Sequence, residues 1–391
     1  MSRRALDAIV VGGGVVGAAA ALAMARAGRR VALVEARAPL RWSPEAPLDL
    51  RVFAFAPSSR ILLERLGVWP VVVEARVQPY RRMRVWDAAS TQSLAFDAAD
   101  VGQPELGHIV EQSLLLDALW RVLEPVGVDC RCPVRVQDLQ VEADGIAVQL
   151  DDGSRLRAAV LLAADGGASP LRQRLGIEVA GYDYDQRGLV AFVRTEHPHE
   201  DTAWQRFLPG GPLAFLPFVD GLCSIVWTLP DAEAGRLRSC ARDAFERELE
   251  RAFESRLGAV ELASERAAFP LRRQLAQRYV HGRAVLLGDA AHLVHPLAGQ
   301  GVNLGLGDVA SLVAALGEEE LPRGEALGRA LRRYERQRRS ENAMAAWAFD
   351  GLNRLFSNDA VLPTLLRGPA LGLVDRIPPL KRFFIARAAG W

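Results

Sequence analysis

The sequence predicts a mixed α/β fold in which helix-covered parallel strands enclose a β-rich middle, and three observations support this prediction. An apolar stretch at residues 8–11 runs into a glycine cluster and then into an alanine-rich helical pattern. Residues 182–229 alternate strand-forming residues with aromatic residues and prolines. Apolar stretches return at 159–163 and 284–287, and helical patterns dominate after Gly301. Strands alternating with helices favour a parallel sheet.

The N-terminal segment has the pattern of a βαβ unit that binds a nucleotide. Gly12, Gly14 and Gly17 follow a strand and open a helix, which ends at Gly28. The first glycine permits a tight turn, the second lets backbone approach a pyrophosphate, and the third lets helix and strand pack closely. Glu35 ends the next strand, where a carboxylate accepts hydrogen bonds from a ribose. An acid there disfavours a 2′-phosphate, so FAD or NAD is the expected ligand.

The rest of the chain follows in six segments. A helix over 113–124 precedes a β-meander from Val134 with Asp-Gly turns, and one charged helix is expected over 231–256. The expected segments are 1–80 (nucleotide-binding βαβ part), 81–111 (first part of a substrate domain), 112–180 (return with the meander), 181–275 (β-rich substrate domain), 276–320 (second return) and 321–391 (helical C-terminal region).

Composition excludes several function classes. Lysine and arginine number 48 against 47 acidic residues, so no basic field attracts nucleic acid. The four cysteines, Cys130, Cys132, Cys223 and Cys240, form no CxxC pair and suggest neither a disulfide framework nor a metal site. No uninterrupted apolar stretch is long enough to span a membrane. We therefore expect a cytoplasmic protein without a metal.

Two further acidic residues stand where strands end. Asp165 and Gly166 follow one apolar strand, and Gly288 and Asp289 follow another. Ligands of open α/β sheets bind at the carboxyl ends of strands. Each pair alone is an ordinary turn, but together with the N-terminal glycines they indicate a shared nucleotide site.

These motifs, in this order, resemble the single-component FAD-dependent aromatic hydroxylases, and most of all the ubiquinone-biosynthesis hydroxylases. The stretches "LRVFAFAPSSRILLERLGVW", "WQRFLPGGPLAFLPF", "SIVWTLP", "GDAAHLVHPLAGQGVNLGLGDVASL" and "LRRYERQRRSEN" carry the resemblance, which spans residues 7 to about 385. It implies a Rossmann-like FAD-binding domain with an inserted β-sheet substrate domain and a helical C-terminus. It also implies tightly bound FAD, with NAD(P)H and O2 as co-substrates.

The resemblance implies a set of FAD-binding residues: Gly12, Gly14, Val16, Gly17, Glu35, Ala36, Arg37, Arg51, Gln112, Val134, Ala164, Asp165, Gly166, Gly288, Asp289, Pro296, Gly299, Gly301, Val302 and Asn303. Asp165 would lie near the pyrophosphate on the NAD(P)H side, and Asp289 would bind the ribityl hydroxyls. Glycines at 299 and 301 would let a helix direct its N-terminal N–H groups at the electron-rich edge of the flavin. For Arg51, a surface salt bridge is the alternative.

The substrate would lie between the flavin and the β-rich middle. The expected wall residues are Trp204, Phe207, Phe215, Pro217 and Trp227, each with ordinary sheet packing as the alternative. His292 and His295 are expected to serve the cofactor loop, with a proton-transfer role or a metal as alternatives. No third ligand stands at a suitable spacing for a metal.

The expected function is hydroxylation of a prenylated phenol or quinol in ubiquinone biosynthesis through a flavin C4a-hydroperoxide. Hydroxylation of a soluble phenol, a non-catalytic FAD-bearing subunit of a membrane-associated complex, and an NAD-linked dehydrogenase are the alternatives. Residues 362–391 mix apolar residues with Arg367, Arg376, Lys381, Arg382 and Arg387. This pattern is typical of peripheral contact at the inner face of a membrane, or of a helix packed on the enzyme or a partner.

Overall fold

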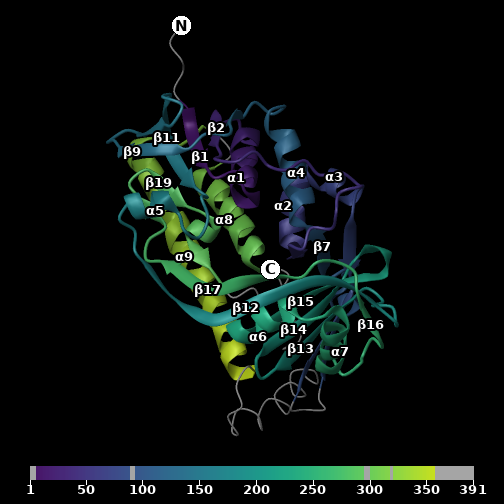
Figure 1. Cartoon of the computed structure of the whole chain (residues 1–391). Helices are drawn as coiled ribbons and strands as arrows, with labels where there is room; N and C mark the ends of the chain where they lie inside the picture. The colour runs from purple at the N-terminus through teal and green to yellow at the C-terminus, as the bar shows by residue number, and fades with distance from the viewer. Residues whose placement is uncertain (1–5, 89–92, 295–299, 318–319, 357–391) are drawn as a thin grey trace.

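The computed structural model describes residues 6–88, 93–294, 300–317 and 320–356, and the structural statements below concern those residues. Their strands form sheets of eight, nine and three strands. In Figure 1 the eight-stranded sheet lies in the upper half of the molecule and the nine-stranded sheet in the lower half. The chain passes between the halves several times, so distant segments meet at their junction.

The eight-stranded sheet has a parallel centre, as the N-terminal pattern predicts. The parallel strands, in spatial order, are β19 (Ala284–Leu286), β11 (Arg155–Ala163), β1 (Leu6–Val11), β2 (Val31–Val34) and β8 (Asp129–Arg131). Ala8, Ile9 and Val10 are successive residues and all three are fully buried, so both faces of β1 are covered. The antiparallel strands β9 (Val136–Val141), β10 (Ile146–Leu150) and β18 (Val280–His281) complete the sheet.

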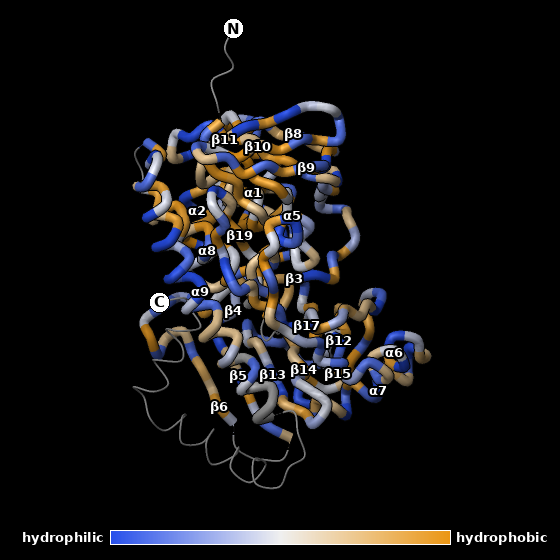
Figure 2. Tube along the Cα trace, turned by 90° about the vertical axis from the view of Figure 1, so that its left-hand side faces the viewer, coloured by the Kyte–Doolittle hydropathy of each residue, from blue (hydrophilic) through white to orange (hydrophobic). Residues whose placement is uncertain are grey.

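Helices cover this sheet and join its core. The alanines of α1 (Val15–Arg26) are buried, and their small side chains let α1 pack closely against its neighbours. Figure 2 shows hydrophobic residues concentrated in α1 and in strands of this half. The other helices of this half are α2 (Pro57–Arg65), α3 (Trp69–Val73), α4 (Gln112–Leu123), α5 (Pro170–Arg174), α8 (Gln300–Leu316) and the long α9 (Gly324–Phe356).

The nine-stranded sheet forms the lower half. Its strands are β5 (Arg82–Asp87), β6 (Ser93–Asp97), β12 (Val179–Thr195), β13 (Thr202–Leu208), β14 (Gly211–Pro217), β15 (Leu222–Pro230), β16 (Val260–Leu262), β17 (Ala267–Ala276) and β20 (His292–Leu293). Two helices, α6 (Asp231–Ser239) and α7 (Arg242–Ala252), pack on one face of this sheet. The other face is turned toward the nucleotide-binding half.

The single helix expected over 231–256 is divided in two. The chain leaves the helical conformation at Cys240, where ψ is 164°. The guanidinium of Arg266 donates hydrogen bonds to the carbonyls of Leu237 and Cys240, each over 2.7 Å. Because these carbonyls at the end of α6 have an arginine as partner, the helix ends there without exposing them.

A three-stranded sheet of β3 (Val52–Phe55), β7 (Gly107–Glu111) and β4 (Val77–Tyr80) lies beside the junction. Residues 107–111 were expected to belong with 81–111 in the substrate domain. In the structure, β5 and β6 join the nine-stranded sheet, whereas β7 pairs with β3 and β4.

The two halves are braced by a long ribbon and by α9. β12 spans 17 residues and pairs with β17 on both sides of an irregularity between Asp183 and Arg187. Near the end of α9, the buried carboxylate of Asp350 accepts hydrogen bonds from the hydroxyls of Tyr182, over 2.5 Å, and of Tyr184. The other part of α9 packs on the upper sheet, where the Tyr334 hydroxyl donates to the carbonyl of Leu286 over 2.9 Å. One helix is thus fixed to both halves.

Candidate cofactor and substrate site

The three motif glycines have distinct environments. Gly12 has φ +100°, and a Cβ there would lie 2.2 Å from the carbonyl oxygen of Ala164. A Cβ at Gly17 would lie 1.9 Å from the carbonyl oxygen of Gly12. A Cβ at Gly14 would meet nothing within 4 Å. Packing therefore requires glycine at 12 and 17, while Gly14 faces open space at the start of α1.

Glu35 holds the glycine turn against the end of β2. One carboxylate oxygen accepts from the backbone N–H of Gly13 over 2.5 Å and the other from that of Arg37 over 2.8 Å. The indole of Trp120 donates to the carbonyl of Gly13 over 2.8 Å. Each carboxylate oxygen can accept a further hydrogen bond, which leaves Glu35 able to bind a ribose. Val134 lies next to this acid and donates its N–H to the carbonyl of Glu35 over 2.8 Å.

Asp165 lies in the turn between β11 and α5, next to Gly12. The Asp165 carboxylate accepts from the hydroxyl of Ser169 over 2.6 Å and from the N–H of Leu171 over 3.0 Å. Burial raises the pKa of Asp165, and the hydrogen bond from Ser169 opposes that rise. The side chain thus caps α5, and the backbone of Ala164 and Asp165 lies directly beside Gly12.

Arg172 connects the two strand-end motifs, and sequence reasoning did not find it. Its guanidinium donates to the carbonyl of Gly167 over 2.8 Å and to that of Ala290 over 2.9 Å. The side chain is buried, although in the stretch "PLRQRLG", which also holds Arg174, it resembles an ordinary surface arginine. It fixes the distance between the loop after β11 and the loop after β19.

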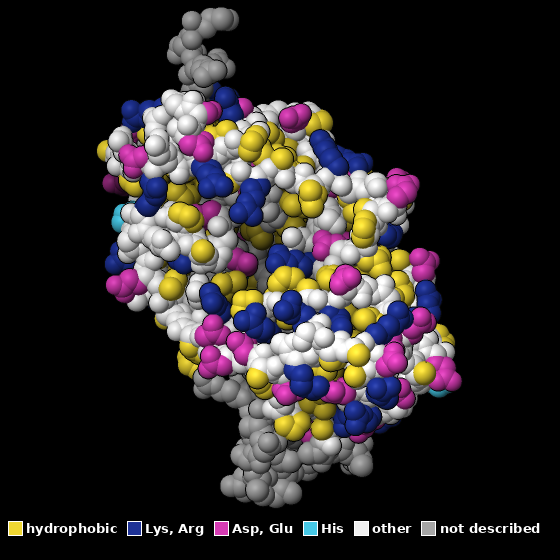
Figure 3. Space-filling model, in the orientation of Figure 1, with side chains coloured by type: hydrophobic (Ala, Val, Ile, Leu, Met, Phe, Trp, Pro, Cys, Tyr) yellow, Lys and Arg dark blue, Asp and Glu magenta, His cyan; other side chains and the backbone are white. Residues whose placement is uncertain are grey.

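Gly288 and Asp289 lie where the expected site needs an accessible acid. Gly288 has φ +56°, and a Cβ there would lie 3.2 Å from Val16. The Asp289 side chain is solvent-accessible, yet protein surrounds it closely enough that burial raises its pKa, which the charges of His292 and Arg51 oppose. Asp289 is therefore accessible to a ligand although protein surrounds it. Figure 3 shows the molecule hollowed near the middle of one face, where the two halves meet.

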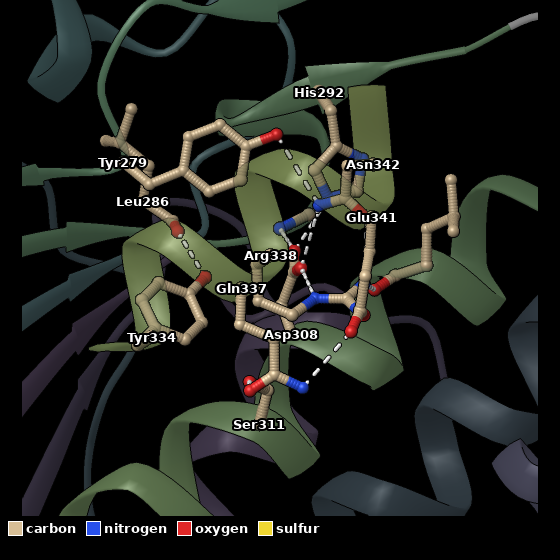
Figure 4. A network of polar contacts seen from close by, with 12 residues as sticks. Tyr279, Leu286, His292, Asp308, Ser311, Tyr334, Gln337, Arg338, Glu341 and Asn342 are labelled. Carbon is tan, nitrogen blue, oxygen red and sulfur yellow. Dashed lines mark hydrogen bonds and ion pairs between the residues drawn. The ribbon is translucent and has the colours of Figure 1, made fainter. Parts of the chain in front are cut away.

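A fully buried network fixes the position of this loop (Figure 4). Asp308 in α8 accepts from the N–H of Gly288 over 2.9 Å and contacts the Nε2 of His292 over 2.6 Å. Its other oxygen accepts from Arg338 over 2.7 Å and from Asn342 over 3.0 Å, both in α9. Burial alone would raise the pKa of Asp308, but His292 and Arg338 lower it to about 2.

The contact with Asp308 holds His292, and with it the loop that follows β19, in place. The Nδ1 of His292 has no hydrogen-bond partner among the described residues. No group of three potential metal ligands is found in the described part of the chain. His295, Pro296 and Gly299 lie outside the described residues. Asp308, Arg338 and Asn342 were missed as site residues because their partners are far apart in the sequence.

The start of α8 is bound to the segment that carries Arg51. The Asn303 side chain donates to the carbonyl of Ala54 over 2.8 Å and accepts from the N–H of Ala56 over 3.0 Å and the hydroxyl of Ser59 over 2.7 Å. Its amide therefore ties α8 to β3 and α2. Gly301 is open, since a Cβ there would meet nothing within 4 Å, and Val302 packs on the core of the upper half.

Arg51 and Gln112 are brought together as the expected site requires. The N–H of Gln112 donates to the carbonyl of Arg51 over 2.9 Å. The Arg51 guanidinium lies 4.4 Å from the centre of the Phe269 ring and so makes a cation–π contact; no salt bridge of Arg51 is found among the described residues. Asp49 holds both segments, because its carboxylate accepts from the N–H groups of Arg51 and Ser113, over 3.0 and 2.9 Å.

The side chains of Arg51 and Gln112 line a cavity of about 200 Å³ between the two halves. The other wall is the free face of the nine-stranded sheet, and the lining is mostly apolar. The lining residues from the lower half are Gly188, Val190, Gln205, Pro212, Ala214, Leu216, Val226, Thr228, Phe269 and Leu271. The volume is below that of sites for whole drug-sized ligands and suits one substituted ring.

The structure corrects the expected substrate wall. Trp204, Phe207, Phe215, Pro217 and Trp227 do not line this cavity. Side chains alternate between the two faces of a strand, and Trp204, Phe215 and Trp227 lie on the face that packs against α6 and α7. Pro217 shares that face with Phe215, and Phe207 packs away from the cavity on Val85 and Leu94. For Trp204, Phe215, Pro217 and Trp227, sequence neighbours on the opposite strand face line the cavity; Phe207 is on the same strand face as Gln205 but packs at the β5–β6 edge of the sheet.

The residues present fit FAD. The open space at Gly14, the accessible Asp289 carboxylate and the open Gly301 lie on segments that meet, since Val16 in the first turn of α1 contacts both Gly288 and Gly305 of α8. An N-terminus of α1 without a side-chain cap offers free N–H groups to an anion. The structure thus places an uncapped helix N-terminus and the carboxylate of Asp289 on segments that meet, with Glu35 hydrogen-bonded to the glycine turn.

Three comparisons identify the family. A family model described as an FAD binding domain matches residues 5–349. The 3-demethoxyubiquinol 3-hydroxylase of Escherichia coli is 36% identical over 393 residues, covering 100% of both chains. The human mitochondrial ubiquinone biosynthesis monooxygenase COQ6 is 33% identical over 443 residues, covering 98% of this chain and 92% of its own.

A solved structure has the same fold. The HpxO protein of Klebsiella pneumoniae, crystallised with FAD and uric acid, superposes with a TM-score of 0.76 at 22% identity, covering 98% of this chain and 96% of its own. No helix in the described ranges has the length and apolar character needed to cross a membrane. The chain belongs to the FAD-binding-domain family and, within it, to the FAD-dependent aromatic-ring monooxygenases of the ubiquinone-biosynthesis group.

Proposed function

We propose that this protein hydroxylates the aromatic ring of a neutral, prenylated phenol or quinol intermediate of ubiquinone biosynthesis, using FAD, NAD(P)H and O2. The observation that carries the proposal is the apolar cavity, which joins residues of the cofactor side, Arg51 and Gln112, to the substrate sheet. A lipophilic ring placed there lies beside the expected flavin site.

The chain's own residues would hold the cofactor at the junction. The first turn of α1 at Gly14 would bind the pyrophosphate, Glu35 the adenosine ribose, and Asp289 the ribityl hydroxyls. When bound, FAD supplies the activation of O2 with electrons from NAD(P)H. The start of α8, tied by Asn303 to β3, would direct its dipole at the flavin, which favours negative charge by ~0.3–2 kcal/mol.

The described lining of the cavity offers no base, so the electron-rich ring itself would act as the nucleophile. None of the described residues that line the cavity is a tyrosine, a histidine or an acid. A side-chain base for the ring hydroxyl is therefore not among them, which suits a ring made electron-rich by several oxygen substituents. The apolar wall also keeps water from the reacting centre.

The test is turnover by purified protein loaded with FAD. We expect NAD(P)H consumption to depend on a short-chain prenylated quinol, with a product heavier by one oxygen atom. Faster turnover of a soluble phenol than of the prenylated ring would favour the soluble-phenol alternative. A protein that binds FAD and quinol but never consumes NAD(P)H would be a non-catalytic subunit instead.

We further propose peripheral contact with the cytoplasmic face of the membrane, where the prenylated substrate resides. The support is the mixed basic and apolar composition of residues 362–391, which lie outside the described residues. Flotation with anionic vesicles should recover the full chain but not a chain ending at residue 356. Co-purification with other ubiquinone-biosynthesis proteins would indicate a complex, the other expected partner.

A further inference from the structure

Two largely buried hydrogen-bonding side chains of the cavity have no protein partner among the described residues. Gln205 is 7% exposed and Thr228 is 2% exposed, and both line the cavity. Neither the Gln205 carboxamide nor the Thr228 hydroxyl is among the fully enclosed polar atoms that lack a partner, so their polar atoms remain accessible from the cavity. A polar atom that opens only into a mostly apolar cavity needs a partner there. The two groups therefore indicate a ligand that accepts or donates hydrogen bonds inside the cavity.

Strand register places the two groups on opposite sides of one apolar floor. Gln205 of β13 pairs with Ala214 of β14, which pairs with Val226 of β15. Thr228 lies two residues beyond Val226 on the same face and pairs with Gly188 of β12. With strands about 4.8 Å apart, β13 and β15 are separated by roughly 10 Å. An aromatic ring lying across Ala214 and Val226 would have one group at each edge.

The chemistry of the two side chains selects a neutral ring. A carboxamide and a hydroxyl each donate and accept, so they match hydroxyl and methoxy oxygens. Among the described lining residues, none from the sheet is charged, and the single charged one, Arg51, comes from the cofactor side and lies over Phe269. A ring carboxylate lying over the sheet would lose its hydration without gaining a counter-charge.

We propose that Gln205 and Thr228 determine specificity by hydrogen-bonding two oxygen substituents of a neutral aromatic ring, and so fix which ring carbon faces the cofactor side. This inference rests on the proposed function. Small residues leave space for the ring: Ala214 lies on the strand between the two groups, and Gly188 pairs with Thr228 on its other side.

The test uses the near-isosteric variants Gln205→Leu and Thr228→Val, with Ser224→Ala as the control. Ser224 is on β15, is buried and also lacks a hydrogen-bond partner, but it does not line the cavity. The probes are a short-chain prenylated quinol and two analogues, each with one ring oxygen replaced by a methyl group. Binding to FAD-loaded, oxidised protein is measured by calorimetry, and turnover and product position are measured separately.

We expect each cavity variant to weaken quinol binding about tenfold, which corresponds to ~1.4 kcal/mol, and to leave FAD content unchanged. Each variant should lose this effect with one of the two analogues, because the partner oxygen is then absent. The double variant should oxidise NAD(P)H with less hydroxylated product and a mixture of product positions. Thermal stability should stay the same or rise, since an unpartnered buried polar group has been removed.

Equal quinol affinity in wild type, Gln205→Leu and Thr228→Val would overturn the inference. So would a loss of stability equal in size to the loss of affinity, because that indicates a structural role. The proposed function fails in a different way: wild-type protein would bind the rings, with the same dependence on Gln205 and Thr228, yet hydroxylate none of them.

Discussion

Replacing Asp308 with asparagine should destabilise the protein strongly, although the two side chains have nearly the same shape. Asp308 is fully buried and accepts hydrogen bonds from Gly288, His292, Arg338 and Asn342. An asparagine has one acceptor oxygen, so at least part of this set loses its acceptor, and the buried Arg338 loses its counter-charge. Breaking a buried ion pair costs about 3–5 kcal/mol.

The loss of folding stability in Asp308→Asn is expected near the lower end of that range, about 3 kcal/mol, because Arg338 keeps its contact with Glu341. The pH dependence has a definite sign. Since the pKa of Asp308 falls from 3.8 to about 2 on folding, its charge stabilises the fold above pH 4, and this contribution of about 2 kcal/mol is lost as pH falls from 4 to 2. The difference between wild type and Asp308→Asn should therefore be largest near neutral pH.

The measurement is thermal unfolding followed by circular dichroism, with flavin release recorded in parallel, at pH 7 and at pH values inside the window from 4 to 2. Glu341→Gln is the matched control, because Glu341 contacts the same arginine from a partly exposed position and should cost less than about 1 kcal/mol. If Asp308→Asn and Glu341→Gln lowered stability equally, the network would not position the loop, and the reasoning would be refuted.

Three further predictions follow from the site. Gly14→Val should fold normally and lose FAD binding, whereas Gly17→Val should fail to fold, because its Cβ would lie 1.9 Å from a carbonyl oxygen. FAD titration and expression yield test these two outcomes. Tight FAD binding by Gly14→Val would contradict the first. Gly188→Val should raise the Michaelis constant for the quinol at unchanged FAD content, because the side chain enters the cavity, and an unchanged Michaelis constant would place the ring elsewhere. Phe215→Ala should cost about 3–5 kcal/mol of stability while the protein that folds keeps its Michaelis constant, since Phe215 packs under α6 and α7; a large rise in that constant would restore the original assignment.

The sequence predicted the nucleotide-binding unit well because its signals are local. A tight turn at Gly12 and the close packing at Gly17 each demand glycine within a few residues, so spacing alone identifies them. Arg51 and Gln112 could be assigned only through the family resemblance, yet the fold joins them by a backbone hydrogen bond. The contacts of Asp308 with α9 join residues 30 or more positions apart, and no local pattern encodes such pairing.

Most of the residues expected to form the substrate wall lie on the strand face away from the cavity for a physical reason. Both faces of the nine-stranded sheet are covered, one by α6 and α7 and the other by the nucleotide-binding half, so apolar residues do not alternate with polar ones. Aromatic residues such as Phe215 and Trp227 fill the helix-covered face because they bury the most area. A cavity instead needs small side chains such as Gly188 and Ala214, which attract no attention in a sequence.

The attachment of α9 at Leu286 and again at Tyr182 and Tyr184 has a mechanical consequence. Because α9 is hydrogen-bonded to both halves, we expect the upper and lower sheets to keep one relative orientation as long as Asp350 keeps its hydrogen bonds with Tyr182 and Tyr184. We therefore expect substrate to enter and product to leave through movements of loops and side chains at the cavity entrance, without a hinge motion of the two halves.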